Sequence, residues 1–376
     1  RESQEFSIRA ILSSMNNWKK SIEERVDLFK SFYVKENKRP LFGFFLGSEY
    51  PVHRYEAAKA IPEGIALTPD HFDIDAYLDD FDYLFESHEK CGGDFIWSAS
   101  IFWGIPWLEA ALGCPVKLKS YSSGSIHAEP LAGFNGPDNI PEFSFNNPWI
   151  KKAIDFLDRA ASRSNGRYPL ATTRMRGISD LLALLYGNED LIFAMLEQPE
   201  VVSAVAEKLT DFWIQFGKMQ IERIPGFYGG VGSFYYNAWA PKGTIWHQED
   251  AAALLSPDLF EQFIKPWDDK IVSAFEGCIM HQHSNGYFPY EYYIDMDFTA
   301  LELHIDNGGP TAESLAPVYS KIMEKKPLII WGEINETDMD WIFSNLQPEG
   351  LSIITVVKNE KEAAALWGKY QILNCL

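Results

Sequence analysis

The chain has 376 residues, a formal net charge of −20 and a pI of about 4.8, which opposes binding to nucleic-acid phosphates and to acidic membrane surfaces. Hydrophobic residues make up 46% and aromatic residues 15%, enough for a large core with aromatic side chains left over for a pocket. No apolar run approaches the roughly 18 residues of a membrane span, and four scattered cysteines without a CxxC pair favour a reducing, cytoplasmic compartment.

Sequence patterns in the first half of the chain predict short strands between longer helices. Strands are expected at 40–46, 94–97 and 168–173, and helices at 22–35, 76–91, 148–164 and 189–223. Residues 1–38 are expected to form an N-terminal helical extension. Two connections, 120–147 and 224–248, are rich in Gly, Pro, Asn and aromatics, and such long loops are typical of functional insertions or lids.

The second half predicts a regular alternation of strands and helices. Ser256, Pro257 and Asp258 form a helix opening, because a capping hydroxyl precedes proline and an acid. Strands are expected at 278–283, 298–306, 327–333 and 351–357, with helices at 256–275, 311–325, after a cap at Thr337, and from 358 onward. This spacing favours parallel βα units, so we expect one α/β domain over 1–376, a (β/α)8 TIM barrel with loop insertions; an open doubly wound sheet is the alternative.

Polar side chains gather where the later strands end. Alternation along 278–283 places His281 and His283 on one face. In a βα barrel the site forms at the carboxyl ends of the strands, which collects His281 and His283, His304 and Asp306, and Trp331 and Glu333. Two imidazoles and a carboxylate suit zinc or another divalent transition metal. The alternatives are an acid/base pair of His304 and Asp306, or hydrogen-bonded structural histidines.

Further candidates for substrate binding lie at other strand ends. Arg174 and Arg176 follow 168–173 and suit a carboxylate or phosphate clamp, although an ordinary salt bridge explains each equally well. Trp103, in an aromatic cluster after the second strand, is expected at a pocket rim, and Trp331, near the end of 327–333, is expected to contact substrate. A further strand candidate, 243–247, ends at His247, and Glu249 and Asp250 beyond it are second-choice polar groups. The sequence has no Gly-rich phosphate loop, GxSxG elbow or HExxH motif.

The order of these segments resembles the uroporphyrinogen decarboxylase superfamily, barrel proteins that include cobalamin-linked methyltransferases for methanol, methylamines and methyl halides. The resemblance covers nearly the whole chain from Arg39. It rests on diffuse helix-and-turn signatures, namely Arg39-Pro40, residues 108–113, 184–187, 198–202 and 255–260, the His281 strand, residues 331–334, and the last strand after Gly350.

The departures from the superfamily pattern bear on activity. The decarboxylases carry an arginine pair after Arg-Pro, where this chain has residues 43–47 without arginine, and a catalytic aspartate where this chain has 98–102 without an acid. The methyltransferases bind zinc through His-x-Cys and a later cysteine. The matching positions here are His281 and His283; the last cysteine, Cys375, lies in the tail, so Glu333 becomes the candidate third ligand.

Three hypotheses follow from the residues and the resemblance. The first is a metal-assisted methyltransferase for a small methylated substrate, with zinc or another divalent metal on His281, His283 and Glu333 and a corrinoid carrier protein as partner. The second is a metal-free decarboxylase or lyase for a carboxylated substrate such as a tetrapyrrole, with His304 and Asp306 as acid and base. The third is a non-catalytic binding protein on the same fold.

Overall fold

A computed structural model describes residues 20–373 of the chain. Ten strands lie in this part: β1 (Leu41–Leu46), β2 (Val116–Leu118), β3 (Ile126–Ala128), β4 (Gly230–Ser233), β5 (Ala238–Pro241), β6 (Thr244–Gln248), β7 (Gly277–His283), β8 (Ala300–Ile305), β9 (Leu328–Gly332) and β10 (Leu351–Val357). Six of them form one parallel sheet in the order β1-β10-β9-β8-β7-β6. Strands β1, β9 and β10 are mostly apolar and buried, as expected for parallel strands covered on both faces.

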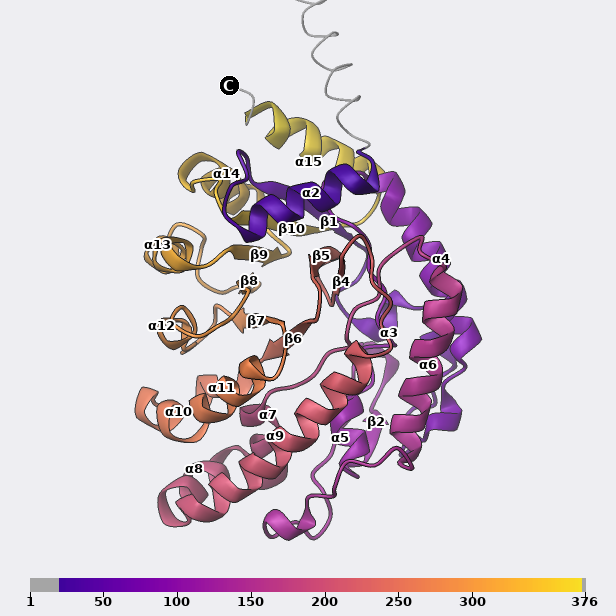
Figure 1. The fold of residues 1–376 in the computed structure, drawn as a ribbon, viewed down its shortest axis with the longest axis vertical. Coiled ribbons are helices and arrows are strands. Elements are labelled where there is room, and N and C mark those ends of the chain that lie inside the picture. The colour runs from indigo at the N-terminus through magenta and orange to yellow at the C-terminus, as the bar shows by residue number, and fades with distance from the viewer. Residues whose placement is uncertain (1–19, 374–376) are drawn as a thin grey trace, which may run out of the picture.

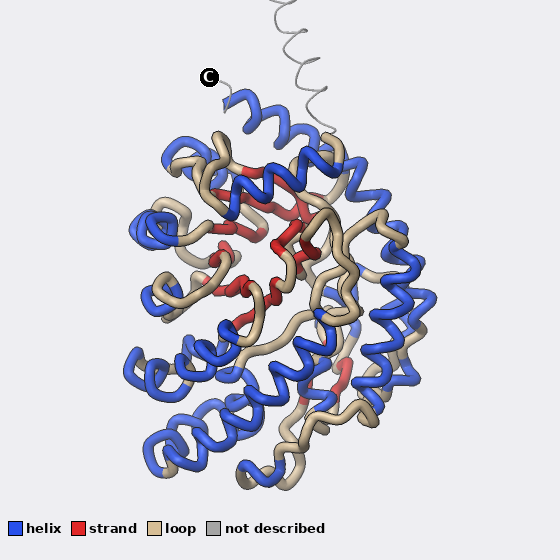
Figure 2. Tube along the Cα trace, in the orientation of Figure 1, coloured by secondary structure: helices blue, strands red, loops and turns tan. Residues whose placement is uncertain are grey.

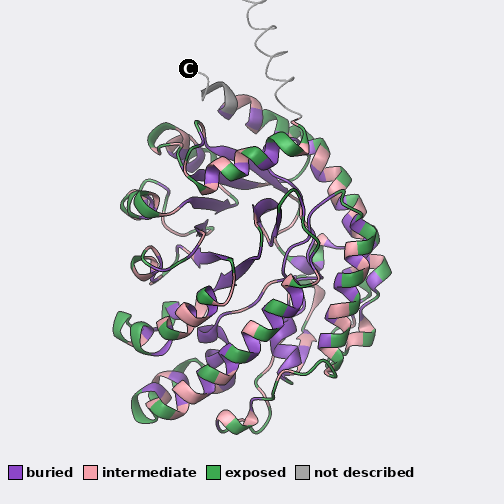
Figure 3. Cartoon of the chain, in the orientation of Figure 1, coloured by how far each residue is buried: buried purple, intermediate pink, exposed green. Residues whose placement is uncertain are grey.

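Fourteen α-helices are described, and most of them lie around the outside of the central parallel strands (Figures 1 and 2). They are α2 (Ile22–Tyr33), α3 (Pro51–Arg54), α4 (Ile74–Cys91), α5 (Trp107–Ala111), α6 (Pro148–Ser164), α7 (Ile178–Tyr186), α8 (Asn188–Glu197), α9 (Pro199–Ile221), α10 (Pro257–Phe263), α11 (Lys265–Ser273), α12 (Tyr290–Tyr293), α13 (Ala316–Lys325), α14 (Glu336–Asn345) and α15 (Glu360–Leu373). Buried residues concentrate on the strands and on the helix faces turned toward them (Figure 3). No helix within residues 20–373 combines the length and the apolar character needed to cross a bilayer.

The α/β class and the parallel sheet of the sequence prediction are confirmed, but the strands predicted at 94–97 and 168–173 are not regular. Ala99 and Leu170 form an isolated parallel bridge, and the N–H of Gly232 in β4 donates to the carbonyl of Leu170. Pro169 has no N–H to contribute to a ladder, which helps to explain why a continuous strand does not form there. Six regular parallel strands therefore stand where the sequence predicted eight.

Several helix boundaries follow from their capping residues. Ser256 caps α10 as expected, with its Oγ accepting from the N–H of Leu259 at 3.3 Å. The predicted cap at Thr337 is wrong, because Asn335 accepts from the N–H of Asp338 at 2.9 Å and α14 begins at Glu336. The long connection 224–248 also differs from the prediction, since the β4–β5 hairpin lies within it, whereas β6 confirms the strand predicted at 243–247.

The predicted N-terminal extension, 1–38, is described only from residue 20, and the part before it lies outside the described residues. Within it, α2 is held to the body of the protein through Arg25. The Arg25 guanidinium pairs with Glu89 in α4 at 2.8 Å and donates to the carbonyl of Phe95 at 2.9 Å. This helix therefore packs on the fold beside β1.

Strand register brings the polar side chains of neighbouring strands into rows. Gln248 at the end of β6 lies opposite His281 in β7, and His281 lies opposite Glu302 in β8. Two residues closer to the carboxyl end of β7, His283 lies opposite His304 in β8. Because the strands are parallel, these rows lie together near the carboxyl ends of β6, β7 and β8.

Candidate metal centre

Two histidines and a carboxylate converge at the ends of β6 and β7. Both histidines are on the same face of β7, and their Nε2 atoms lie 3.2 Å apart. The Oδ1 atom of Asp250 lies 4.0 Å from Nε2 of His281 and 3.9 Å from Nε2 of His283. That oxygen is buried and has no hydrogen-bond partner among the described residues. Three potential ligand atoms therefore face one point, as a three-residue metal site requires.

A second layer of carboxylates fixes the direction of both imidazoles. The Nδ1 atom of His281 donates to Glu302, and the Nδ1 atom of His283 donates to Asp306 Oδ1 at 2.6 Å. Asp306 is itself held, because its Oδ2 accepts from the N–H of Ser284 at 2.9 Å. Imidazoles that hold metals commonly donate their other nitrogen to a carboxylate in this way. Both Nε2 atoms are thus presented to the site.

The pKa values of the two histidines are shifted in opposite directions from the ordinary value of histidine. Burial, followed by the charge of His283, lowers the pKa of His281 to about 3. Burial also acts to lower the pKa of His283, but the hydrogen bond to Asp306 and the charge of Asp250 outweigh it and raise that pKa to about 9. One neutral and one protonated imidazole can then share a single Nε2–H hydrogen bond.

The predicted acid/base pair of His304 and Asp306 is not hydrogen-bonded. The Nε2 atom of His304 lies 4.0 Å from Asp306 Oδ1, and that oxygen already accepts from His283. The His304 ring instead packs 5.1 Å from the His283 ring and 5.5 Å from the Trp331 ring, measured between centroids. These three polar residues, His283, His304 and Asp306, form a second set of potential metal ligands that shares His283 with the first.

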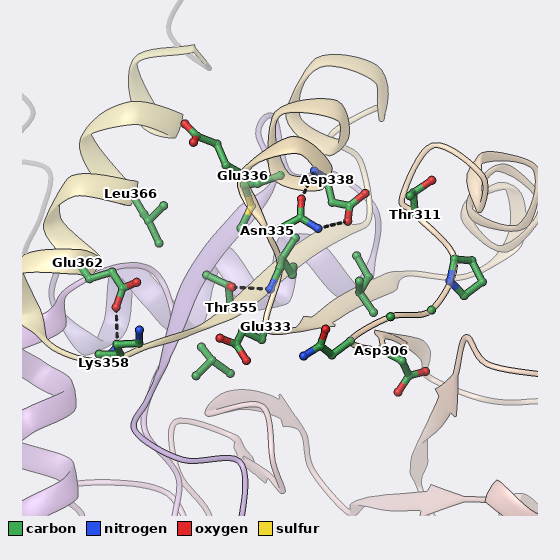
Figure 4. A pocket seen from close by; sticks show the side chains of 18 of the residues that line it. Asp306, Thr311, Glu333, Asn335, Glu336, Asp338, Thr355, Lys358, Glu362 and Leu366 are labelled. Carbon is green, nitrogen blue, oxygen red and sulfur yellow. Dashed lines mark hydrogen bonds between the residues drawn. The ribbon is translucent and has the colours of Figure 1, made fainter.

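Asp250, and not Glu333, is the carboxylate that the structure brings to the two histidines. Glu333 follows Gly332, whose φ of 149° turns the chain at the end of β9, and its side chain is exposed. It lines a separate cavity of about 740 Å³ between the ends of β8, β9 and β10, which it shares with Asp306 (Figure 4). Among the described residues, no set of potential metal ligands includes Glu333.

A smaller cavity of about 350 Å³ opens in front of the histidines. Its aromatic wall consists of Tyr50, Trp103, Phe234, Tyr235 and Trp246. Trp246 stacks on His281 with ring centroids 5.3 Å apart. Glu49 lines the same cavity, and burial together with the charge of Glu333 raises its pKa to about 6.

Arg174 is the arginine that lines this cavity, at the place predicted for a substrate anion. Its guanidinium lies over the Trp103 ring, 5.9 Å from the centroid, and its Nε is buried without a hydrogen-bond partner. Within residues 20–373, no carboxylate lies within 4.0 Å of Arg174, whereas most arginines of the chain form such a pair. A half-buried guanidinium without a carboxylate partner is suited to bind an anionic group.

Three other predicted substrate residues lie outside this cavity. Arg176 lies 3.6 Å from both Glu109 and Asp180, the ordinary salt-bridge alternative. Trp331 is fully buried behind His304, and His247 of β6 is fully buried against Trp213 of α9, with its Nε2 atom 2.8 Å from Asp268 Oδ1. Both side chains belong to the interior, so the pocket-lining role predicted for them is not met by the structure.

Two residues of the centre, Asp250 and Glu302, are not among the metal ligands or catalytic residues predicted from the sequence. The sequence predicts Asp250 only as a second-choice polar group, beyond the end of the strand candidate 243–247. Glu302 is not among the predicted site residues, although alternation along 298–306 places it on the same face as His304. The signal for Glu302 was therefore available in the strand pattern.

Comparisons with known proteins support the fold and leave the family open. No protein family matches the chain. A solved structure of a methyltransferase from Methanosarcina mazei aligns over 92% of this chain and 97% of its own, with a TM-score of 0.58 and 11% sequence identity. At that identity the likeness shows a shared fold. A ribosome-recycling factor from Amoebophilus asiaticus (strain 5a2) is 24% identical over 170 residues, 42% of this chain and 78% of that protein, too low an identity to assign a family.

Proposed function

We propose that this protein is a metal-assisted methyltransferase that acts on a small substrate. The observation that carries the proposal is the convergence of His281 Nε2, His283 Nε2 and Asp250 Oδ1 on one point. The fold shared with a methyltransferase supports it. We further propose that the extended segments 95–100 and 168–173 complete an eight-stranded ring with the six regular strands.

The donor set fits zinc or another divalent transition metal. Two imidazole nitrogens and one carboxylate oxygen are a ligand set of catalytic zinc, which leaves a position for substrate. When bound, such a metal supplies Lewis-acid activation of a thiol or hydroxyl group on the substrate. Glu302 and Asp306 hold the two imidazoles in the orientation that presents Nε2. The buried, unpartnered Oδ1 of Asp250 fits the third position.

The cavity indicates the kind of substrate. Its volume of about 350 Å³ lies at the lower end of the roughly 300–1,000 Å³ of small-molecule sites. Arg174 provides a cation for a carboxylate at one wall, while the aromatic side chains Trp103, Tyr235 and Trp246 provide flat apolar surfaces. We propose a small anionic molecule whose heteroatom receives or gives up the methyl group, with a corrinoid carrier protein as the partner in transfer.

A metal-free lyase is less well supported by the same geometry. That mechanism needs Asp306 to orient His304, but the two are 4.0 Å apart and Asp306 is hydrogen-bonded to His283 and Ser284. Arg174 is compatible with either chemistry.

The test is metal analysis followed by a transfer assay. Protein purified without an affinity tag that binds metals is expected to contain close to one equivalent of zinc or another transition metal per chain. The reconstituted protein is then mixed with methylcobalamin and thioglycolate. Transfer of the methyl group to the thiolate releases Co(I) cobalamin and yields the methyl thioether, and both are measured by absorbance and mass spectrometry. Absence of bound metal after reconstitution would overturn the proposal.

A further inference from the structure

Gln248, the last residue of β6, links the candidate ligand Asp250 to helix α7. Its side-chain nitrogen donates to Asp250 Oδ2 at 2.6 Å and to Asp180 Oδ2 at 3.2 Å. With Oδ2 engaged, the remaining oxygen of Asp250 is the one that faces the Nε2 atoms of His281 and His283. The orientation of the Asp250 carboxylate is therefore set by an amide that does not itself belong to the donor set.

Asp180, in the first turn of α7, is fixed from several sides. Its Oδ2 accepts from the N–H of Gly177 at 3.1 Å, and its Oδ1 accepts from the N–H of Ala251 at 3.0 Å. Arg176 Nη2 lies 3.6 Å from the same Oδ1. Asp180 is only 2% exposed, so the nearby guanidinium offsets part of the cost of burying its charge. Asp180 thus holds the backbone directly after Asp250 as well as the side chain of Gln248.

Glu249 makes a parallel connection to the same helix turn. Its two carboxylate oxygens accept from the N–H groups of Ile178 and Ser179, each at 2.7 Å. A Cβ atom at Gly177 would lie 2.0 Å from the Gln248 carbonyl oxygen and 2.3 Å from Glu249 Cδ. Glycine at 177 is therefore needed for the start of α7 to approach the end of β6 so closely. The residues on both sides of Asp250 in the chain are bound to this turn.

We propose that the first turn of α7 is a positioning device for the metal centre, with Asp180 and Gln248 as positioning residues that act through Asp250. This inference rests on the proposed function, because it assumes that Asp250 is a ligand. It also assigns Arg176 a place as the counter-charge of Asp180. Replacement of a residue that holds a metal ligand by a hydrogen bond typically weakens metal binding about 10- to 100-fold.

The test compares two substitutions in this device with a matched control. Asp180→Asn removes an acceptor from α7, and Gln248→Met removes the donor to Asp250 while keeping a similar side-chain volume. Asp338→Asn is the control, because Asp338 is also buried in the first turn of a helix and accepts from a distant backbone N–H, that of Ala312 at 2.7 Å. Asp338 contacts none of the three candidate ligands.

Two readouts separate positioning from general destabilisation. Zn²⁺ affinity is measured by competition with a chromophoric chelator, and the visible absorption of the Co²⁺-loaded protein reports the ligand geometry. We expect about 10- to 100-fold weaker Zn²⁺ binding and an altered Co²⁺ spectrum for Asp180→Asn and Gln248→Met. The control Asp338→Asn is expected to keep wild-type affinity and spectrum, even if its melting temperature falls.

The outcomes distinguish this inference from the function on which it rests. If the wild-type protein binds neither Zn²⁺ nor Co²⁺, both the proposed function and this inference are overturned. If the wild type binds both ions and the two variants bind them within twofold with unchanged spectra, the inference is overturned and the proposed function stands. Equal losses in Asp180→Asn and Asp338→Asn would also overturn it, since the effect would then be one of general stability.

Discussion

The Nε2 atoms of His281 and His283 lie 3.2 Å apart while both Nδ1 atoms are engaged by carboxylates. Two Nε2 lone pairs facing each other at this distance repel unless a positive charge lies between them. In the metal-free protein a proton on His283 meets this requirement, because its pKa is raised to about 9 and that of His281 is lowered to about 3. A divalent cation bound at the same place would displace that proton.

Metal binding is therefore expected to release about one proton per site at pH 7.5. His283 must become neutral to bind a metal, and below a pKa of about 9 it is protonated; His281, with a pKa of about 3, is already neutral and contributes no proton. Affinity should accordingly rise about tenfold per pH unit between pH 6 and 9. Calorimetry of Zn²⁺ binding in buffers of different ionisation enthalpy measures the proton count. In Asp306→Asn, which removes the carboxylate that raises the pKa of His283, the count should fall well below one.

The two overlapping sets of potential ligands can be told apart by substitution. Asp250→Ala should weaken Zn²⁺ binding at least 100-fold, because it removes a direct ligand, whereas His304→Ala should change it less than about threefold. Equilibrium dialysis of both variants beside the wild type provides the measurement. The reverse pattern would assign the metal to His283, His304 and Asp306. Circular dichroism should show an unchanged fold in both variants, since the large core does not depend on the metal.

Sequence patterns predicted the elements whose stability is local. The strand over 351–357 and the helix capped by Ser256 are confirmed because an apolar run or a capping side chain is visible in a short window. The irregular segments predicted as strands at 94–97 and 168–173 are not distinguishable from regular strands in the sequence, since their backbone partners are distant. The N–H of Ile96, for example, donates to the carbonyl of Asn237.

The site was predicted less completely than the fold. Alternation along β7 correctly placed His281 and His283 on one face, but the choice of third carboxylate depended on how the chain turns after each strand. Gly332 directs Glu333 into another cavity, while the connections of Gln248 direct Asp250 toward the histidines. These turns are set by tertiary contacts that a single sequence does not reveal.

The buried ion pair between Arg39 and Asp94 should make a measurable contribution to stability. Asp94 is fully buried, and Arg39 binds both of its oxygens, at 2.5 and 2.8 Å. Arg39→Met is expected to lower the free energy of unfolding by about 3 kcal/mol, the lower end of the range for a buried pair, because Lys20 also contacts Asp94. Lys59→Met, which breaks an exposed pair with Glu56, should change it by less than about 1 kcal/mol. Urea unfolding of the two variants checks this comparison.

The same pair predicts a loss of stability in acid. Burial alone would raise the pKa of Asp94, but the hydrogen bond and charge of Arg39 hold it below its usual value. A carboxyl group with a lowered pKa in the folded state stabilises the protein above the unfolded value of about 3.9, and this contribution is lost as the pH falls through the folded pKa. The difference in unfolding free energy between wild type and Asp94→Asn should therefore shrink below about pH 4. A difference independent of pH down to pH 2 would contradict the role assigned to the charge.

Arg174 should decide which substrates the cavity accepts. Each charge-assisted hydrogen bond to a carboxylate contributes roughly 1.5 to 3 kcal/mol, so Arg174→Met is expected to weaken binding of a small carboxylate about 10- to 100-fold. The same substitution should weaken binding of a neutral amide analogue less than about threefold, because the amide gains little binding energy from the guanidinium. Isothermal titration of thioglycolate and of its amide into the Zn²⁺-loaded wild type and variant measures both effects. Equal losses for the two ligands would show that Arg174 acts through packing on Trp103 and not through its charge.

Uroporphyrinogen should be excluded from the same cavity. One guanidinium, Arg174, faces a volume of about 350 Å³, whereas this tetrapyrrole carries many carboxylates on a large ring. The net charge of −20 further opposes accumulation of a polyanion, and at physiological salt this repulsion is screened only beyond a Debye length of about 8 Å. Arg176, the other arginine predicted to bind substrate, is paired with Glu109 and Asp180 and cannot supply a second free charge. The purified protein is therefore expected neither to bind nor to decarboxylate uroporphyrinogen at micromolar concentration, as followed by fluorescence of the oxidised porphyrins after chromatography. Formation of coproporphyrinogen would contradict the assignment of a small substrate and favour the lyase hypothesis.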